Sequence, residues 1–249
     1  PVQHERSKNP GDNSEMVRGR RALHQAQLYR PLAEALCDLV ATCRDVSTLL
    51  DIGCGEGYYD GMLSARLPGL SVYGVDIAKT AVRLAARDYR SQHYAVASSR
   101  HLPVMTSSID LAMCIFSPVN DSEVARAVRP NGYYLEVGPA AQHLWELKTA
   151  LYEQPREHPL LRRTIPGGAL VQEGECHYEK QLTQTELQAV VAATPFAFRG
   201  HREKREALRE QSDFVITLGF SWRLFRLAAL RDTVASGAVL DDALESTDL

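Results

Sequence analysis

Three glycines at alternate positions constrain this chain's fold more than any other feature. A short apolar run ends at Ile52, and Gly53, Gly55 and Gly57 then lead into a segment with helical spacing. Glycine adopts backbone angles that other residues avoid, so a parallel strand ending in D-x-G-x-G-x-G turns sharply at the carboxyl edge of its sheet. The turn leaves room for a ligand, toward which the N–H groups of the next helix point. Such a turn alone is also compatible with a dinucleotide site or with a tight turn that binds nothing.

Strand-like and helix-like segments alternate around this turn. We expect strands at "STLLDIG", "SVYGVDI", "HYAVAS", "IDLAMCIFSP" and "YYLEVGP", and helices near 57–66, 78–89 and 121–128. This alternation is typical of βαβ units and predicts an α/β fold with a parallel sheet. Farther along, we expect a possible strand at "CHYEKQL", a helix over 183–193 and a last strand at "DFVITLGF" before "SWRLFRL".

The N-terminal part of the chain differs from this α/β pattern. Residues 1–20 are polar and include a turn around Asp12, whereas 21–44 have helical apolar spacing. Pro31 suits the start of a helix better than its middle, so we expect two helical pieces that meet near Tyr29. We therefore divide the chain into an arm and helical flap (1–45), an α/β domain (46–228) and an acidic tail (229–249) that we expect to be disordered.

Composition limits the class of protein. Among the 249 residues, 45% are hydrophobic and 24% are charged, which is ordinary for a soluble chain. No apolar stretch approaches the length of a membrane span, and no signal-peptide pattern is present. Five cysteines without a CxxC pair predict reduced thiols in a cytoplasmic protein, with no disulfide framework and no metal site in this chain.

The net charge of −3 hides an uneven distribution. The residues after Arg231 include acidic side chains but no lysine or arginine. Basic side chains form two groups earlier in the chain: Arg6, Lys8, Arg18, Arg20 and Arg21, and then Arg199, Arg202, Lys204, Arg205 and Arg209. Such groups can neutralise phosphates, but on sequence alone solvated helix faces are the favoured interpretation.

Acidic residues near the glycine turn indicate which kind of ligand the turn binds. Asp51 precedes the first glycine and is placed to accept hydrogen bonds or to meet an ammonium group. Asp76 ends the second strand, where a carboxylate can accept both hydroxyls of a ribose. After the third strand, Ser98 and Ser99 are placed to lie along the edge of an adenine ring. The turn lacks GK[ST] and the G-x-G-x-x-G spacing, which argues against a P-loop and against a nicotinamide site.

These motifs carry a resemblance to a known family. "LDIGCGEG" (50–57), "GVDIA" (74–78), "IDLAMCIFSP" (109–118) and "RPNGYYLEVGP" (129–139) resemble the ordered motifs of class I, Rossmann-like S-adenosylmethionine (SAM)-dependent methyltransferases. The flanks "PVQHERSKNPGDNSEMVRGRRALH", "LYRPL", "HLWELK" and "TPFAFR" are similar to bacterial large-subunit (23S) ribosomal RNA guanine-N1 methyltransferases. The resemblance then covers most of residues 1–227. It implies a mostly parallel sheet with helices on both faces, SAM as cofactor, ribosomal RNA as partner and a possible homodimer.

Two features depart from the family pattern. Family members usually carry an N-terminal zinc ribbon with a CxxC pair ahead of the "PVQH" segment. The sequence begins at that segment, and we expect the ribbon to have been removed upstream of Pro1. The acidic tail has no counterpart in the family pattern.

The resemblance also implies roles for single residues. Gly53, Gly55, Glu56 and Gly57 match the cofactor turn, and Asp76 matches the acid that binds the ribose. Tyr29 and His143 match positions that help enclose the cofactor. Without the resemblance, Tyr29 would be read as a helix-packing aromatic residue and His143 as a histidine with satisfied hydrogen bonds.

The chemistry of guanine N1 adds a requirement. N1 carries a proton at neutral pH, so an enzyme needs a base for that proton or donors that stabilise negative charge on O6. Candidate bases are Asp12, His143 and Glu146; we expect Phe116 to stack on a ring and Asp121 to cap the next helix. A small-molecule methyltransferase and a SAM-binding RNA scaffold without turnover remain the alternatives.

Overall fold

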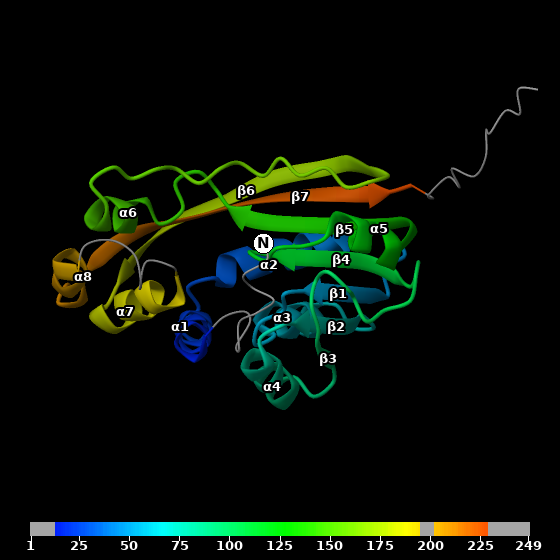
Figure 1. Cartoon of the computed structure of the whole chain (residues 1–249), viewed down its shortest axis with the longest axis horizontal. Helices are drawn as coiled ribbons and strands as arrows, with labels where there is room; N and C mark the ends of the chain where they lie inside the picture. Colours follow the sequence, from blue (N-terminus) through cyan, green and yellow to red (C-terminus); the bar gives the residue numbers. More distant parts are fainter. Residues whose placement is uncertain (1–12, 195–201, 229–249) are drawn as a thin grey trace, which may run out of the picture.

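A seven-stranded sheet forms the centre of the molecule in the computed structural model, which describes residues 13–194 and 202–228 (Figure 1). The strand order is β3-β2-β1-β4-β5-β7-β6. The first five of these strands are parallel, and β7 runs antiparallel to both β5 and β6. Their bounds are β1 Thr48–Ile52, β2 Ser71–Asp76, β3 His93–Val96, β4 Ile109–Ile115, β5 Val128–Pro139, β6 Gly168–Leu182 and β7 Phe214–Leu227. The predicted α/β fold is thereby confirmed.

Helices cover both faces of the sheet because the inner strands are apolar on both sides. Leu49 and Met113 belong to a core that also contains residues of α2 (Arg30–Thr42) and α3 (Tyr58–Arg66). Their neighbours along the strands, such as Leu50 and Ala112, belong to a second core with residues of α5 (Asp121–Ala127). Side chains in a strand alternate between faces, so adjacent residues feed the two cores.

The N-terminal flap consists of two helices that meet at Tyr29, as predicted. Tyr29 is the N-cap residue of α2, and proline lies in the first turn of that helix. However, α1 (Ser14–Gln25) begins earlier than the expected start at residue 21, because the Asn13 side chain accepts hydrogen bonds from two backbone N–H groups of its first turn. Gly19 lets α1 cross α7 (Gln184–Ala193) closely, since a Cβ there would lie 2.7 Å from the backbone nitrogen of Ala193.

The C-terminal strands are longer than predicted. The expected strands "CHYEKQL" and "DFVITLGF" are parts of β6 and β7, which pair from Leu182 and Phe214 to Gly168 and Leu227. Helices α6 (Trp145–Leu151), α7 (Gln184–Ala193) and α8 (Arg202–Arg209) gather at one end of this ribbon (Figure 1). Within residues 13–194 and 202–228, none of the helices is long and apolar enough to cross a membrane.

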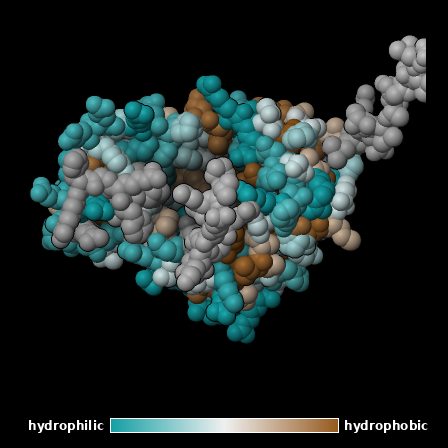
Figure 2. Space-filling model, viewed as in Figure 1, coloured by the Kyte–Doolittle hydropathy of each residue, from teal (hydrophilic) through white to brown (hydrophobic). Residues whose placement is uncertain are grey.

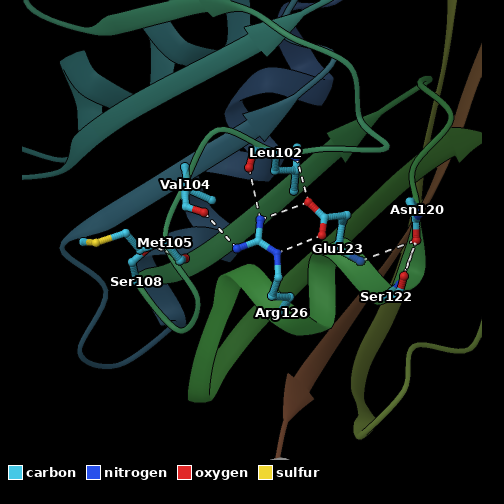
Figure 3. Close-up of polar contacts among 8 residues, drawn as sticks. All are labelled: Leu102, Val104, Met105, Ser108, Asn120, Ser122, Glu123 and Arg126. Carbon is cyan, nitrogen blue, oxygen red and sulfur yellow. Dashed lines mark hydrogen bonds and ion pairs between the residues drawn. The ribbon is translucent and has the colours of Figure 1, made fainter.

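A polar cluster fixes the loop between β3 and β4 (Figure 3). Arg126 of α5 donates to the carbonyls of Val104 and Leu102 at 2.8 and 3.1 Å, and its ion-pair partner Glu123 accepts from the Leu102 N–H at 2.7 Å. The N-cap of α5 is Asn120, whose side chain accepts from the N–H groups of residues 122 and 123. The expected cap, Asp121, is therefore wrong: this residue lies one position inside the helix and pairs with an arginine of a later loop.

Candidate active site

A cavity of about 390 Å³ opens where β1, β4 and β5 end. Figure 2 shows hydrophilic surface over most of this face and hydrophobic surface in and around a hollow near its centre. The lining comes from the flap, the glycine turn with the start of α3, the ends of β4 and β5, the loops after β5 and the end of α7. It comprises Met16, Arg20, Leu23, His24, Tyr29, Asp51, Gly53, Cys54, Gly55, Glu56, Tyr58, Tyr59, Ile115, Phe116, Pro139, His143, Leu144, His158, Ala193 and Thr194. A cavity of this size is typical of small-molecule and cofactor sites.

Glycine is required at the three positions of the turn for different structural reasons. All three have positive φ angles, 90° at Gly53, 56° at Gly55 and 81° at Gly57. A Cβ on Gly53 would lie 2.2 Å from the Ser117 hydroxyl, and one on Gly57 would lie 2.7 Å from that of Tyr94. A Cβ on Gly55 would meet no atom within 4 Å, although this glycine lines the cavity. Gly55 is thus the position where the backbone is open to a ligand, while Gly53 and Gly57 are needed for packing.

Asp76 lies at the end of β2 beside the turn. One carboxylate oxygen accepts from the Gly55 N–H at 3.0 Å and the other from the Ala78 N–H at 2.7 Å. A carboxylate oxygen has a second lone pair, so both retain capacity to accept from ribose hydroxyls. Asp76 does not itself line the cavity, and neither do Ser98 and Ser99, which remain predicted rather than observed cavity residues.

Glu56 joins the turn to the flap. Its carboxylate is buried and forms an ion pair with His24 of α1, whose ring stacks on that of Tyr58 at a centroid distance of 4.1 Å. Burial alone would raise the pKa of Glu56, but the hydrogen bond and charge of His24 hold it below its usual value. Glu56 therefore enters the site as a carboxylate that anchors α1 over the turn.

Behind the turn, two carboxyl groups are fully buried together. Asp51 ends β1 and lines the cavity, and Asp60 lies in the first turn of α3. The two groups are close enough for each to affect the ionisation of the other. Burial and the Asp60 charge raise the pKa of Asp51 well above its ordinary value, and burial raises the pKa of Asp60 to about 7. At neutral pH this pair holds a proton.

Aromatic rings gather along one part of the cavity wall. Tyr29 lies 5.1 Å from Phe220, 6.3 Å from His143 and 6.4 Å from Phe116 between ring centroids. Phe116 follows β4 with a φ of 54° and is 38% exposed, so a large apolar ring stands at the cavity in a strained backbone conformation. Such a wall suits a flat ring.

His143 is a neutral group in this wall. It is buried, and its Nδ1 accepts from the Gly219 N–H at 3.4 Å, which places the ring proton on Nε2. Burial, together with His158 and Lys148, lowers the pKa of His143 to about 3. The side chain therefore acts as a hydrogen-bond donor through Nε2 and is a weak proton acceptor.

Neither of the other two candidate bases is found at the cavity beside His143 among the described residues. The carboxylate of Glu146 accepts from the Thr217 N–H and hydroxyl at 2.7 and 2.6 Å and does not line the cavity, so the structure removes it from the candidates. Asp12 lies outside the described residues. His158 was not predicted: it reaches the cavity from a loop, and among the described residues its buried Nε2 has no hydrogen-bond partner.

The described members of the first basic group, Arg18, Arg20 and Arg21, do not form one surface, and Arg6 and Lys8 lie outside the described residues. Arg20 lines the cavity, Arg21 pairs with Asp88 at 2.6 Å, and Arg18 is exposed. Successive residues on a helix point in different directions, so a cluster in sequence is dispersed in space.

Comparison with known proteins defines the class. A methyltransferase-domain family model matches residues 49–132, the segment that contains the glycine turn and Asp76. The YcgJ protein of Bacillus subtilis has the same fold, with a TM-score of 0.52 at 18% identity over 79% of this chain and 98% of its own. The chain is a SAM-dependent methyltransferase with a Rossmann-like fold.

Curated relatives resemble the chain beyond that domain. A 23S rRNA (guanine(748)-N1)-methyltransferase of Streptomyces fradiae is 29% identical over 82% of this chain and 75% of its own length. Bacillus subtilis YxjB, which has a provisional name as a 23S rRNA (guanine-N1)-methyltransferase, is 25% identical over 80% and 74%. Nocamycin O-methyltransferase of Saccharothrix syringae is 32% identical, but only over 45% of each chain. The predicted resemblance to guanine-N1 methyltransferases is thereby confirmed.

The residues present fit SAM. The cofactor combines an adenosine with a sulfonium centre and an amino acid bearing an ammonium group. Gly55 offers open backbone, Asp76 has acceptor capacity beside it, and Asp51 supplies a carboxyl oxygen that no described residue satisfies. When bound, SAM supplies an electrophilic methyl group; the protein's part is to hold it and to exclude water.

Proposed function

We propose that the chain methylates N1 of a guanine in 23S ribosomal RNA. The observation that carries this proposal is the extent of similarity: the two guanine-N1 relatives match about 80% of the chain, far beyond the cofactor segment at 49–132. The flap and the segments after β5, among them His143, His158 and the end of α7, line the cavity beside the glycine turn. Similarity in these parts concerns the substrate, whereas similarity in the cofactor segment is shared by methyltransferases of many kinds.

The aromatic wall supports a nucleobase as the acceptor. Phe116 and Tyr29 provide ring faces at the cavity, and stacking on such faces holds a base that has left its helix. Guanine N1 is hidden by pairing in a duplex, so the target base must be unpaired or flipped outward before it reaches this wall.

The Nε2–H group of His143 supports guanine as the substrate, because it can donate a hydrogen bond during methylation of N1. As the N1 proton leaves, negative charge grows on O6, and a fixed N–H directed at O6 stabilises that charge. A neutral imidazole with its proton on Nε2 has this property, and it does not lose the property as the pH varies above about 5, because the pKa of His143 lies near 3. We propose that His143 is this donor and not the base.

Methyl transfer to RNA provides the test. The chain is incubated with radiolabelled SAM and unmodified 23S rRNA, and the product is mapped by reverse transcription, which stops at an N1-methylated guanine. We expect one stop in the RNA. His143→Phe should lower kcat by about 10²–10³, the effect of deleting one such donor, whereas His143→Gln retains an N–H and should lose less.

The rival function predicts a different result. A small-molecule O-methyltransferase is favoured by the 32% identity with the nocamycin enzyme, but that match covers less than half of the chain. If the labelled methyl group appears in no RNA while SAM binds normally, the rRNA proposal is wrong and the small-molecule enzyme becomes the better interpretation.

A further inference from the structure

The buried carboxyl pair behind the glycine turn is not explained by the fold. Oδ1 of Asp51 and both oxygens of Asp60 are buried without a well-formed hydrogen bond among the described residues. Removing one such group from water without a partner is unfavourable, and two adjacent carboxylates also repel each other. A pair of this kind persists when one proton is shared between the two groups.

No cation offsets the pair. The titratable groups facing it come from every element packed around the turn: Cys54, Asp76 of β2, Tyr89 after α4 (Lys79–Asp88), Tyr94 of β3 and Cys114 of β4. All of these groups are neutral or anionic. Among the described residues, no arginine, lysine or histidine acts on either carboxyl. The described residues therefore supply no positive charge that would allow both groups to ionise.

We propose that Asp60 is a positioning residue for the cofactor: it shares a proton with Asp51 in the free protein, and binding of the cofactor's ammonium group at Asp51 releases that proton. Asp51 lines the cavity next to Gly55, whereas Asp60 lies behind it in α3. A cation beside Asp51 favours the ionised form, so the pair binds protons less tightly in the complex than in the free protein. The inference concerns the cofactor half alone and does not depend on which substrate is methylated.

The sign of the pH dependence follows from linkage. Protons are bound before the cofactor enters and are released on binding, so affinity rises with pH while the pair is still protonated. The limit is about tenfold in Kd per pH unit when one proton is released. The increase ends above the pKa of the pair in the free protein; burial raises the pKa of Asp60 to about 7.

Calorimetry measures the released proton directly. S-adenosylhomocysteine, the demethylated cofactor, is titrated into the protein at pH 6.5 in buffers of different ionisation enthalpy, at a pH where an α-amino group stays protonated. We expect release of about half to one proton per ligand bound. SAM should give the same value, whereas 5′-methylthioadenosine, which lacks the ammonium group, should bind without proton release.

Two variants separate the pair from the fold. In Asp60→Asn the amide donates to Asp51 and holds it ionised, so we expect binding without proton release and with an affinity independent of pH from 6 to 8. Asp38→Asn removes an exposed carboxyl of α2 and serves as the control that behaves like the wild type. The proposal is overturned if wild-type protein releases no proton, if 5′-methylthioadenosine releases as many as S-adenosylhomocysteine, or if Asp60→Asn releases as many as the wild type. Should Asp60→Asn fail to fold, the wild-type titrations still decide.

Discussion

Gly55 allows the cofactor assignment to be tested against a matched control within the same chain. Gly55 and Gly69 both have positive φ angles, 56° and 94°, and a Cβ at either position would meet no atom within 4 Å. The two glycines differ in one respect that matters: Gly55 lines the cavity, whereas Gly69 precedes β2 in a loop. Alanine at each site therefore brings the same kind of backbone strain without a clash.

The expected stability changes follow from that strain. An alanine in the left-handed region costs about 1–2 kcal/mol, and at Gly69, where φ is farther from that region, at least as much. For a domain of this size, 1 kcal/mol lowers Tm by roughly 2–4 °C. Gly55→Ala and Gly69→Ala should thus melt a few degrees below the wild type when no ligand is added.

Ligand-induced stabilisation separates the variants. S-adenosylhomocysteine at about 100 times its Kd stabilises a folded protein by about 2.7 kcal/mol, and we expect the resulting rise in Tm for the wild type and for Gly69→Ala. In Gly55→Ala the methyl group occupies ligand space, so the rise should largely disappear. Differential scanning fluorimetry measures all three proteins. An undiminished rise in Gly55→Ala would refute the assignment of this turn as the cofactor site.

Three further predictions concern the cofactor, the fold and the RNA. Asp76→Ala should weaken S-adenosylhomocysteine binding about tenfold or more in calorimetry, since a charge-assisted hydrogen bond contributes roughly 1.5–3 kcal/mol; wild-type affinity would remove Asp76 from the site. Asp110 accepts four hydrogen bonds from Ser47 and Thr48 and pairs with Arg129, and its pKa is lowered although burial opposes this. A carboxyl group whose pKa is lower in the folded than in the unfolded protein stabilises the fold at pH values above its unfolded pKa, near 4, and this stabilisation is lost as the pH falls. Asp110→Asn should therefore be less stable than the wild type in urea at pH 7, and the difference in stability should shrink toward pH 2. Changing Arg202, Lys204 and Arg205 together to alanine should flatten the log–log salt dependence of RNA binding by about 0.7–0.9 per lost phosphate contact; an unchanged slope would place the RNA elsewhere.

The cofactor half was predictable because its signals are local. The glycine turn, Asp51 and Asp76 lie within one βαβ unit, where each residue's position relative to the strand end follows from the spacing alone. The structure brings Gly55 to the cavity and Asp76 to within 3.0 Å of its N–H. The flap boundary at Tyr29 was predictable for a similar reason, since proline marks the first turn of a helix by its own geometry.

The missed features depend on contacts between distant segments. His24 and Glu56 are 32 residues apart, and nothing in the composition of α1 indicates that its histidine is anchored to the turn. His158 reaches the cavity from a loop without periodicity. The helix cap of α5 was assigned one residue too late, because Asn120 and Asp121 both have suitable side chains and only the backbone geometry distinguishes them.

Helix α1 connects the two halves of the site. Its His24 is anchored to Glu56 in the cofactor turn, its Arg21 pairs with Asp88 of α4, and its Gly19 packs against α7 at the far side of the cavity. The ion pair to Glu56 is nearly buried, so breaking it leaves a charge without a partner and is much less favourable than the loss of an exposed pair. Because α1 touches the turn at one end and α7 near its middle, a change in either contact should shift the part of the cavity wall that α1 forms. The flap therefore belongs to the candidate active site as well as to the fold.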